Sequence, residues 1–212
     1  MTDLAGSSLR DFTASLASAA PAPGGGSASA ATGAAGAALL EMVVHLTVGK
    51  EKYRDSWEEL AGVAERIAGI RTRLLELVDE DTRAFEAIIT ARRLPKETEE
   101  EKNLRQRAID ESTLLATTVP MQTAFFAGKA LALAPLIAAK GNPNASSDAF
   151  VGGLLLSAAL EGALTNVRIN LGGVADKELR RGFREDAEEL EKKAAQLLRD
   201  VREIARGRTI AL

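Results

Sequence analysis

Three consecutive acids in this sequence have the type and setting that proton transfer requires. Asp79-Glu80-Asp81 is followed one helical turn later by Ala84-Phe85. Acids at positions i and i+2 do not share a helix face, so at most one or two of these carboxylates can point into a pocket. A carboxylate within an apolar face costs free energy unless it is paired or used, and burial raises its pKa. The alternative is a solvated acidic turn, which composition alone favours.

Asparagine and aspartate residues gather in a second group. Asn166 and Asn170 lie one turn apart on a common helix face, within an otherwise apolar stretch. Asn142, Asn144 and Asp148 stand at the start of the same stretch. Buried amides usually hold neighbouring backbones, so a structural role and a polar pocket are equally good interpretations of this group.

The third candidate is the glycine-rich turn Pro23-Gly24-Gly25-Gly26-Ser27. Exposed backbone N–H groups at a helix N-terminus suit an anion or the polar edge of a ligand. The turn lacks the Lys-Ser/Thr of a P-loop, and it follows a helix, whereas a Rossmann fingerprint follows a strand. A tight turn between packed helices explains it equally well.

Basic and phenolic donors stand near the end of the helix expected after this turn. They are Lys50, Lys52 and Tyr53. His45, the single histidine, is expected to be a partly exposed helix residue rather than a catalyst.

Composition excludes several classes of site. The chain has no cysteine, which removes disulfides, thiolate metal sites and cysteine nucleophiles, and one histidine is too few for a histidine-rich zinc site. A net charge of −3 provides no field that recruits nucleic acid or an anionic membrane. The N-terminus lacks the basic and apolar regions of a signal peptide. We expect a cytoplasmic protein with no bound metal, no nucleic-acid partner and no membrane partner.

Two apolar stretches, 27–47 and 149–171, approach the length of a membrane span. The first is mostly alanine and glycine and includes Glu41 and His45, and the second carries Glu161 and Arg168. Neither is a clean run of about 20 apolar residues. We therefore interpret both as buried helices of a soluble protein.

The elements that must position these groups are helices. Ser8, with Asp11 three residues later, is expected to cap a first helix that ends before the glycine-rich turn. Ser27 or Ser29 is expected to cap a second helix that reaches about Thr47 and has small residues nearly all round. Glycine inside a helix costs about 1 kcal/mol relative to alanine. Close packing against neighbouring helices, or against a second subunit, must offset that cost.

Five further helices follow from apolar periodicity, caps and prolines. They are expected over about 56–93, from the Thr98–Glu101 capping box to Pro120, over 121–140 with a kink at Pro135, from a Ser146 or Ser147 cap to Gly172-Gly173, and over about 176–207. No segment predicts a strand. The sequence therefore predicts one all-α domain over 1–212, a bundle of about seven helices whose core is built from leucine, isoleucine, valine and alanine.

Six motifs occur in a fixed order along nearly the whole chain. They are P-A-P-G-G-G-S-A (21–28), M-V-V-H-L-T-V-G-K-E-K-Y (42–53), V-D-E-D-T-R-A-F-E-A (78–87), R-L-P-K-E-T-E-E-E-K (93–102), S-D-x-x-V (147–151) and N-V-R-I-N-L (166–171). This series closely resembles the formiminotetrahydrofolate cyclodeaminase domain and the related methenyltetrahydrofolate cyclohydrolases. The resemblance implies an all-α fold, a homodimer and chemistry between N5 and N10 of tetrahydrofolate.

Two reactions follow from the resemblance. In the cyclodeaminase, 5-formimino-tetrahydrofolate loses ammonia as N10 closes on the formimino carbon, which gives 5,10-methenyl-tetrahydrofolate. In the cyclohydrolase, water adds to that methenyl carbon and the ring opens to 10-formyl-tetrahydrofolate. We place the cyclodeaminase first and the cyclohydrolase as the alternative. Both need proton transfer, and the resemblance implies no permanently bound cofactor, only a tetrahydrofolate derivative as substrate.

The resemblance also assigns roles to the candidate residues. Asp81 is the first choice for general acid and base, and Asp148 the second. Asn166 and Asn170 would bind the pterin edge or position Asp81. The other substrate-binding candidates are the turn residues Gly24, Gly25, Gly26 and Ser27, the lysines Lys50 and Lys52 for the glutamyl carboxylates, and Tyr53 and Asn142.

One position departs from the family pattern. His45 stands where the motif usually has asparagine, so contact between His45 and a ligand would alter substrate preference. An interpretation of another class is an inactive helical scaffold or folate-binding protein. The four polar residues Asp81, Asp148, Asn166 and Asn170 argue against it, because a scaffold has no need for them in apolar helices.

Overall fold

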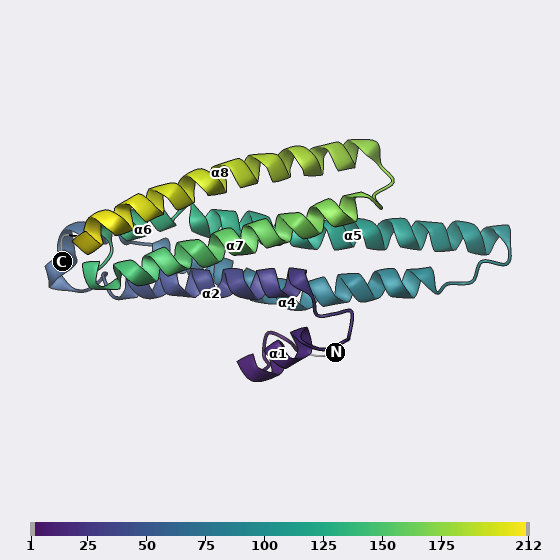
Figure 1. Ribbon diagram of the computed structural model, residues 1–212, viewed down its shortest axis with the longest axis horizontal. Helices are drawn as coiled ribbons and strands as arrows, with labels where there is room; N and C mark the ends of the chain where they lie inside the picture. The colour runs from purple at the N-terminus through teal and green to yellow at the C-terminus, as the bar shows by residue number, and fades with distance from the viewer. Residues whose placement is uncertain (1–2, 211–212) are drawn as a thin grey trace.

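The computed structural model describes residues 3–210 of the chain, with side chains for residues 3–208. These residues form helices and no strand (Figure 1). The α-helices are α1 Leu9–Leu16, α2 Gly25–His45, α3 Trp57–Leu60, α4 Val63–Arg92, α5 Glu99–Leu131, α6 Ala134–Lys140, α7 Ser146–Leu171 and α8 Lys177–Ile210, with 3₁₀ turns at Glu51–Ser56 and Pro143–Ala145. Because α3 is a single turn, seven longer helices remain, which confirms the predicted all-α bundle. The predicted domain over 1–212 includes residues 1–2 and 211–212, which lie outside the described residues.

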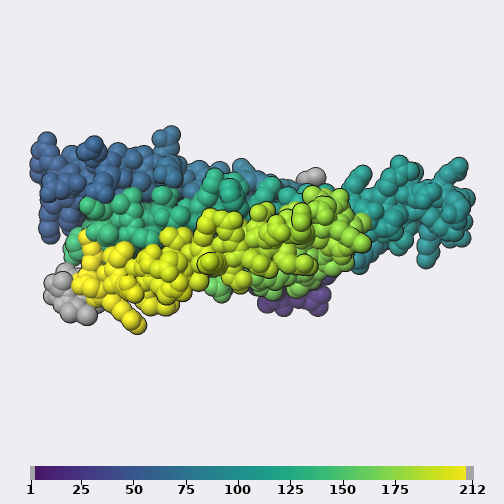
Figure 2. All heavy atoms as spheres, turned by 90° about the horizontal axis from the view of Figure 1, so that it is seen from above, coloured from purple at the N-terminus to yellow at the C-terminus, as the bar shows by residue number. Residues whose placement is uncertain are grey.

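Four long helices form the centre of the bundle. α2 packs against α4 and α7, and α5 packs against the same two helices. α8 packs along α7 and also contacts α5 and α6 (Figure 1). α4 and α5 continue as a two-helix hairpin beyond the end of α8, and Figure 2 shows this hairpin projecting at the right. α1 stands off the bundle beside α2 and α4 and buries none of its residues (Figure 1).

The small residues of α2 allow α7 to approach closely. A Cβ added at Gly36 would lie 2.9 Å from the carbonyl oxygen of Gly152, and a Cβ added at Gly152 would lie 3.0 Å from that of Gly36. Gly33 faces Ala159 in the same way, at 3.3 Å. The expected compensation for glycine inside this helix is therefore confirmed, and it comes from α7.

The buried side chains are aliphatic, as composition predicts. Among the described residues the fully buried large side chains are leucine, isoleucine and valine, and the buried apolar core contains no aromatic residue. Alanine fills the close contacts between helices, with Ala30, Ala37, Ala124, Ala127 and Ala159 all at 0% exposure. Such a core holds the central helices at short separations, which fixes where their ends meet.

Helix starts agree with the predicted caps in two cases and differ in two. Ser8 accepts a hydrogen bond from Asp11 N, and Thr98 forms the full capping box with Glu101. Neither Ser27 nor Ser29 is a cap, because α2 begins at Gly25 after Gly24 and both serines lie inside the helix. α7 begins at Ser146 after Ala145, without a side-chain cap, because the 3₁₀ turn before it leads directly into the helix.

The helix predicted over 56–93 is broken near its start. Residues up to Leu60 form a 3₁₀ turn and the short α3, and α4 begins only at Val63. Gly62 separates the two with φ = +72°, a left-handed conformation that glycine adopts without strain. The amphipathic pattern continues across this break, so periodicity alone could not reveal it.

Prolines in α5 and α6 act differently from the prediction. α5 continues through Pro120 to Leu131 instead of ending there. Proline removes the N–H that would bond the carbonyl four residues earlier, which is that of Ala116. Asn170 supplies the missing donor, with Nδ2 at 2.6 Å from Ala116 O. The predicted kink at Pro135 is a break after Leu131, and Pro135 stands in the first turn of α6, where it needs no N–H partner.

Three helical stretches are long and apolar enough to cross a membrane by length and composition: Gly25–His45, Glu99–Lys140 and Pro143–Leu171. Within the fold, 50% to 56% of each apolar window is buried against other helices. These stretches form the centre of the bundle, which agrees with the interpretation of 27–47 and 149–171 as buried helices.

Candidate active site

The glycine-rich turn places the first residues of α2 directly over α4. Gly24 is the N-cap of α2, with an extended backbone and no side-chain cap. A Cβ added at Gly26 would lie 2.0 Å from Oδ1 of Asp81 on α4. A side chain at position 26 would therefore occupy the space of the Asp81 carboxylate. The turn is glycine-rich at this position because the carboxylate needs the space.

Asp81 is held by Ser27, the third residue of α2. Its Oδ2 accepts a hydrogen bond from Ser27 N at 2.8 Å, and Ser27 Oγ lies 3.1 Å away. The same hydroxyl is 2.8 Å from Val78 O, and since it has one proton it donates to only one of these oxygens at a time. The contact at the start of α2 also places the carboxylate where the helix dipole favours negative charge.

The environment of Asp81 raises its pKa. Burial disfavours the charged carboxylate and raises the pKa above its ordinary value, while the hydrogen bonds from Ser27 act in the opposite direction. A carboxyl group with a raised pKa is suited to accept a proton and return it near neutrality. This is the property that the sequence predicts for Asp81.

The three consecutive acids point in three directions. Asp79 Oδ1 accepts from Leu4 N at 2.8 Å and so ties down the N-terminal segment. Glu80 pairs with Arg73, while Asp81 reaches the turn before α2. Only Asp81 combines burial with a place beside the glycine-rich turn. The expectation that at most one or two of these acids can share a pocket agrees with this arrangement.

The two asparagines on α7 have different partners. A Cβ at Gly25 would lie 3.4 Å from Asn166 Nδ2, so Asn166 stands beside the first turn of α2, and it donates to Gly162 O at 2.9 Å. Asn170 faces α5 and holds the carbonyl that Pro120 leaves without a donor. Asn166 is therefore the one of the two that lies against the turn.

The other predicted residues gather at the opposite end of α2. Tyr53 donates its hydroxyl to Asn142 Oδ1 at 2.7 Å, and Asn142 N donates to Thr47 Oγ1 at 2.8 Å. Lys50 and Lys52 are exposed nearby, and Lys52 Nζ lies 5.6 Å from the centre of the Tyr53 ring. This cluster has polar donors and cations but no carboxylate seated as Asp81 is.

One chain thus presents the predicted residues as two clusters. α2 has 21 residues and is about 30 Å long. α7 runs antiparallel to it, since Gly25 faces Asn166 and Gly36 faces Gly152. Asp148, in the first turn of α7, is therefore at the far end from Asp81. One end holds the residues of the turn and its neighbours: Gly24, Gly25, Gly26, Ser27, Asp81, Asn166 and Asn170. The other end holds Lys50, Lys52, Tyr53, Asn142 and Asp148. His45, the last residue of α2, is exposed at that second end.

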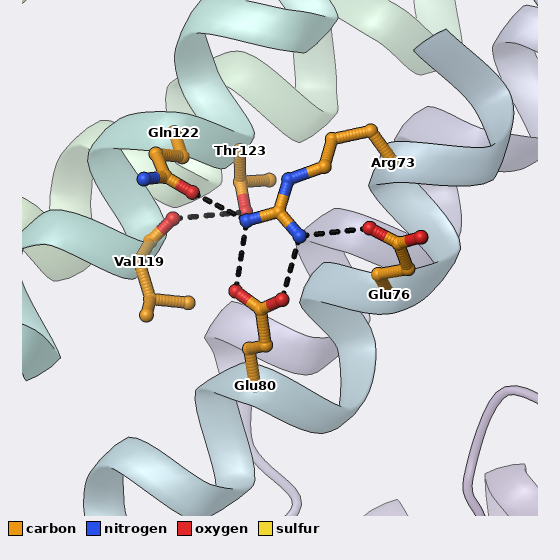
Figure 3. A network of polar contacts seen from close by, with 6 residues as sticks. All are labelled: Arg73, Glu76, Glu80, Val119, Gln122 and Thr123. Carbon is orange, nitrogen blue, oxygen red and sulfur yellow. Dashed lines mark hydrogen bonds and ion pairs between the residues drawn. The ribbon is translucent and has the colours of Figure 1, made fainter. Parts of the chain in front are cut away.

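A charged network lies beside the site, and the sequence analysis did not predict it. Figure 3 shows the Arg73 guanidinium between Glu76 and Glu80 on α4 and Gln122 on α5. Glu80 accepts two hydrogen bonds from it, at 2.6 and 2.9 Å, and Gln122 Oε1 accepts at 2.6 Å. The spacing of Arg73 to Glu76 and Glu80 is a helical pattern that could have identified the part on α4. Gln122 comes from another helix and has no sequence signal.

Two hollows flank the turn. One of about 560 Å³ lies between α1 and α4, with Pro23, Thr82 and Glu86 in its wall. Thr82 Oγ1 is 3.2 Å from Ser27 Oγ, so this hollow ends one side chain away from Asp81. The other, of about 380 Å³, is lined by Pro21, Phe85 and Arg93 among others. A ring system bound in the first hollow would lie against the turn and close to the carboxylate.

Metal binding has no evident place at this site. Within the residues that the structure describes, no three histidine, cysteine or acidic side chains cluster as metal ligands would. The absence of a metal from the chemistry stays a prediction.

Comparison with known proteins gives a consistent picture. The family model described as Formiminotransferase-cyclodeaminase matches residues 8–189. Methenyltetrahydrofolate cyclohydrolase of Methylorubrum extorquens is 41% identical over 169 residues, which are 80% of this chain and 81% of that protein. Formimidoyltransferase-cyclodeaminase of Sus scrofa is 35% identical over 79% of this chain, which spans about a third of that longer protein (31%). The crystal structure of formiminotetrahydrofolate cyclodeaminase from Thermotoga maritima superposes with a TM-score of 0.85 at 28% identity, over 95% of this chain and 96% of the other.

Proposed function

The chain belongs to the formiminotransferase-cyclodeaminase family, and from that premise we propose that it acts at the N5/N10 bridge of tetrahydrofolate as a methenyltetrahydrofolate cyclohydrolase. One observation favours the hydrolase over the deaminase. The match to a protein of that name covers four fifths of both chains, whereas the formimidoyltransferase-cyclodeaminases are matched over about a third of their length. This reverses the order of the two activities expected from the sequence.

Asp81 is the group that performs the proton transfers in this proposal. As a carboxylate it takes a proton from water while the water oxygen bonds to the methenyl carbon. The carbon is then tetrahedral and carries a hydroxyl and both nitrogens. Asp81 returns its proton to N5 as the bond from carbon to N5 breaks, and the hydroxyl proton goes to solvent as the formyl group forms on N10. The raised pKa of Asp81 supports both steps.

The neighbours of Asp81 hold it in position for these steps. Ser27 N fixes one carboxylate oxygen, which leaves Oδ1 as the oxygen without a donor from Ser27. Gly26 provides the space that Oδ1 occupies. Asn166, beside Gly25, is placed to bind an amide or ring nitrogen of the pterin. The tetrahydrofolate derivative is the substrate, and we propose that no further cofactor is bound permanently.

The second candidate is the cyclodeaminase, which the Thermotoga maritima structure favours because the two chains match almost end to end. In that reaction N10 bonds to the formimino carbon and its proton passes to the formimino nitrogen. Asp81, in its protonated form, donates a second proton to the same nitrogen, which leaves as ammonia. The same residues serve both reactions, since each passes through a carbon bonded to both N5 and N10.

An absorbance assay of the methenyl chromophore tests the proposal. With purified protein and 5,10-methenyl-tetrahydrofolate, the hydrolase accelerates loss of the absorbance above the spontaneous rate. Appearance of the absorbance from 5-formimino-tetrahydrofolate identifies the deaminase instead. Inertness in both assays, with Asp81→Asn indistinguishable from the natural protein, would support the inactive scaffold.

We also propose that the protein is a homodimer that completes each site from two copies. The exposed faces of α2 and α7 carry Met42, Leu46, Val151 and Leu154, each 37% to 43% exposed, along the middle and one end of the bundle. If two copies pair antiparallel through these faces, the Asp81 end of one meets the second cluster of the other. Mixing inactive Asp81→Asn and Asp148→Asn chains should then restore activity, because each mixed dimer has one intact site. Activity that stays absent, or a monomer by light scattering, would refute this arrangement.

Localisation and other partners are proposals of the same kind. We propose that the protein is cytoplasmic and binds neither nucleic acid nor membrane. Burial of half or more of the apolar window of each long helical stretch and the net charge of −3 support this. Fractionation of cells should recover the protein in the soluble fraction without salt or detergent.

A further inference from the structure

A row of hydroxyl groups connects Asp81 with the larger of the two hollows beside the turn. The wall of that hollow, of about 560 Å³, includes Thr82 but not Asp81. Thr82 Oγ1 lies 3.2 Å from Ser27 Oγ, and Ser27 Oγ lies 3.1 Å from Asp81 Oδ2. Each step is within hydrogen-bond reach, so the row runs from the hollow through two side chains to the carboxylate.

The Thr82 hydroxyl can join this row because its usual acceptor is already taken. Inside a helix, threonine often donates its hydroxyl to the carbonyl four residues earlier, as Thr90 does to Glu86 O at 2.9 Å. The corresponding carbonyl for Thr82 is Val78 O, which accepts from Ser27 Oγ at 2.8 Å. Among the described residues, Ser27 Oγ is the only hydrogen-bond partner of Thr82 Oγ1. The proton of Thr82 can therefore point into the hollow.

Ser27 is the inner member of the row and is fully buried, at 0% exposure. Its backbone N–H donates to Asp81 Oδ2 at 2.8 Å, which fixes the carboxylate beside the hydroxyl of the same residue. That hydroxyl has one proton and can also accept, and its possible partners are Val78 O, Asp81 Oδ2 and Thr82 Oγ1. A hydroxyl that accepts a proton from one neighbour and gives its own to another passes a proton on and is itself unchanged.

We propose that Thr82 and Ser27 form a hydroxyl relay that carries protons between Asp81 and a tetrahydrofolate derivative in this hollow, an inference that rests on the proposed folate function. Asp81 Oδ2 gives its proton to Ser27 Oγ, Ser27 gives its own to Thr82 Oγ1, and Thr82 gives its own to N5. Each hydroxyl oxygen loses one proton and gains one, so one proton moves from Asp81 to the substrate. In the reverse direction the relay takes a proton from the attacking water. Thr82 is the member that touches the substrate, and Ser27 acts through it.

The competing arrangement is direct contact between the substrate and Oδ1 of Asp81. That oxygen lies against the backbone of Gly26, where an added Cβ would be 2.0 Å away, and Gly26 is buried. Oδ2, in contrast, is the oxygen that the row joins to the wall of the hollow. The two arrangements can be separated by substitution, because only the relay uses the hydroxyl of Thr82.

The test removes that hydroxyl and keeps the shape of the side chain. In Thr82→Val, kcat for loss of methenyl absorbance should fall by about 100-fold, the lower end of what a positioned acid–base group contributes, with KM little changed. Thr82→Ser restores a hydroxyl and should recover most of kcat. Thr72→Val is the matched control, because it makes the same change at an exposed position of α4, and it should keep the natural kcat.

A solvent isotope measurement separates a relay from a structural role. Because several protons move together through the relay, kcat of the natural protein and of Thr82→Ser should fall along a curve as the fraction of D₂O rises. Transfer of a single proton gives a straight line, which is the result expected for the remaining activity of Thr82→Val. A straight line for the natural protein would overturn the relay.

Breaking the row at its inner member gives an independent check. Ser27→Ala removes the inner hydroxyl and keeps the backbone N–H that holds Asp81. Since a row broken once cannot be broken again, Ser27→Ala/Thr82→Val should be no less active than the weaker single variant. Two independent losses that multiply would contradict the relay.

The outcomes for the relay and for the folate function are distinct. Full activity of Thr82→Val beside an inactive Asp81→Asn would overturn the relay and leave the folate function standing. A loss in Thr82→Val that Thr82→Ser does not recover, together with a lower Tm, would show a structural role and also overturn it. A natural protein inert toward both folate substrates would refute the relay and the proposed function together.

Discussion

Replacing Gly26 by alanine tests whether the glycine-rich turn exists to seat Asp81. The new Cβ would lie 2.0 Å from Oδ1, 2.4 Å from Cγ and 2.6 Å from Oδ2 of Asp81. Ordinary contact begins at 3.4 Å, so the carboxyl group must move by at least about 1.4 Å, the difference between these distances. That movement takes Oδ2 away from Ser27 N, which now lies at 2.8 Å.

The expected effects on stability and activity differ in size. A hydrogen bond to a charged group contributes about 1.5–3 kcal/mol, and alanine in a helix returns up to about 1 kcal/mol relative to glycine. With the full return from alanine, the net loss is about 0.5–2 kcal/mol, which lowers Tm by about 1–8 °C in a chain of this length. Activity should fall further, since a displacement of about 1 Å in a catalytic group costs about 100-fold.

The assay is loss of methenyl absorbance together with a thermal melt. Gly69→Ala is the matched control, because it introduces the same methyl group on α4 with nothing within 4 Å. It should be as active as the natural protein and slightly more stable. The decisive measurement is the double variant Gly26→Ala/Asp81→Asn, which should be no less active than Asp81→Asn alone. A further loss in the double variant, or a fully active Gly26→Ala, would refute the argument that Gly26 acts through Asp81.

Three further predictions follow from contacts described above. Burial raises the pKa of Asp81, so the natural protein loses stability as pH rises through the folded-state pKa and this carboxyl group becomes charged. The asparagine of Asp81→Asn stays neutral at every pH. The Tm of Asp81→Asn minus the Tm of the natural protein should therefore increase from pH 4 to pH 8. Asn170→Ala should cost about 1–3 kcal/mol in urea unfolding by leaving a buried carbonyl without its donor, and adding Pro120→Ala should recover part of it by restoring an N–H. Arg73→Lys should cost about 0.5–1 kcal/mol by removing the two parallel bonds to Glu80, and the loss should shrink at high salt, as melts in 0.05 and 0.5 M NaCl would show.

Local signals predicted the parts of the fold that local interactions determine. The Thr98–Glu101 box opens α5 as expected, because both of its hydrogen bonds join residues three apart. The small residues of α2 predicted close packing for a similar reason, since glycine inside a helix needs compensation wherever the helix lies. The cost of an acid within an apolar face drew attention to the three acids 79–81, and the family resemblance then selected Asp81 among them.

The sequence patterns could not predict contacts between segments that are far apart along the chain. Ser27 looks like a helix cap, and its contact with Asp81 joins residues 54 apart. Pro120 was predicted to end a helix. α5 continues through it because Asn170, on α7, supplies the donor that proline lacks, and a local pattern does not show that donor. Motif order placed Asp148 and Asp81 in one site, while the antiparallel arrangement of α2 and α7 separates them within a chain. In each case the deciding partner lies on another helix, where no local rule applies.

The three directions taken by Asp79, Glu80 and Asp81 limit how this chain can change in length. Each residue in a helix is turned by about 100° from the last, so one residue inserted between Arg73 and Asp79 would rotate all three acids away from their partners together. The N-terminal segment, the arginine network and the catalytic candidate would be lost in a single event. Insertions and deletions should accumulate instead in the exposed connection 94–98 at the tip of the α4–α5 hairpin, which leaves the register of α4 intact.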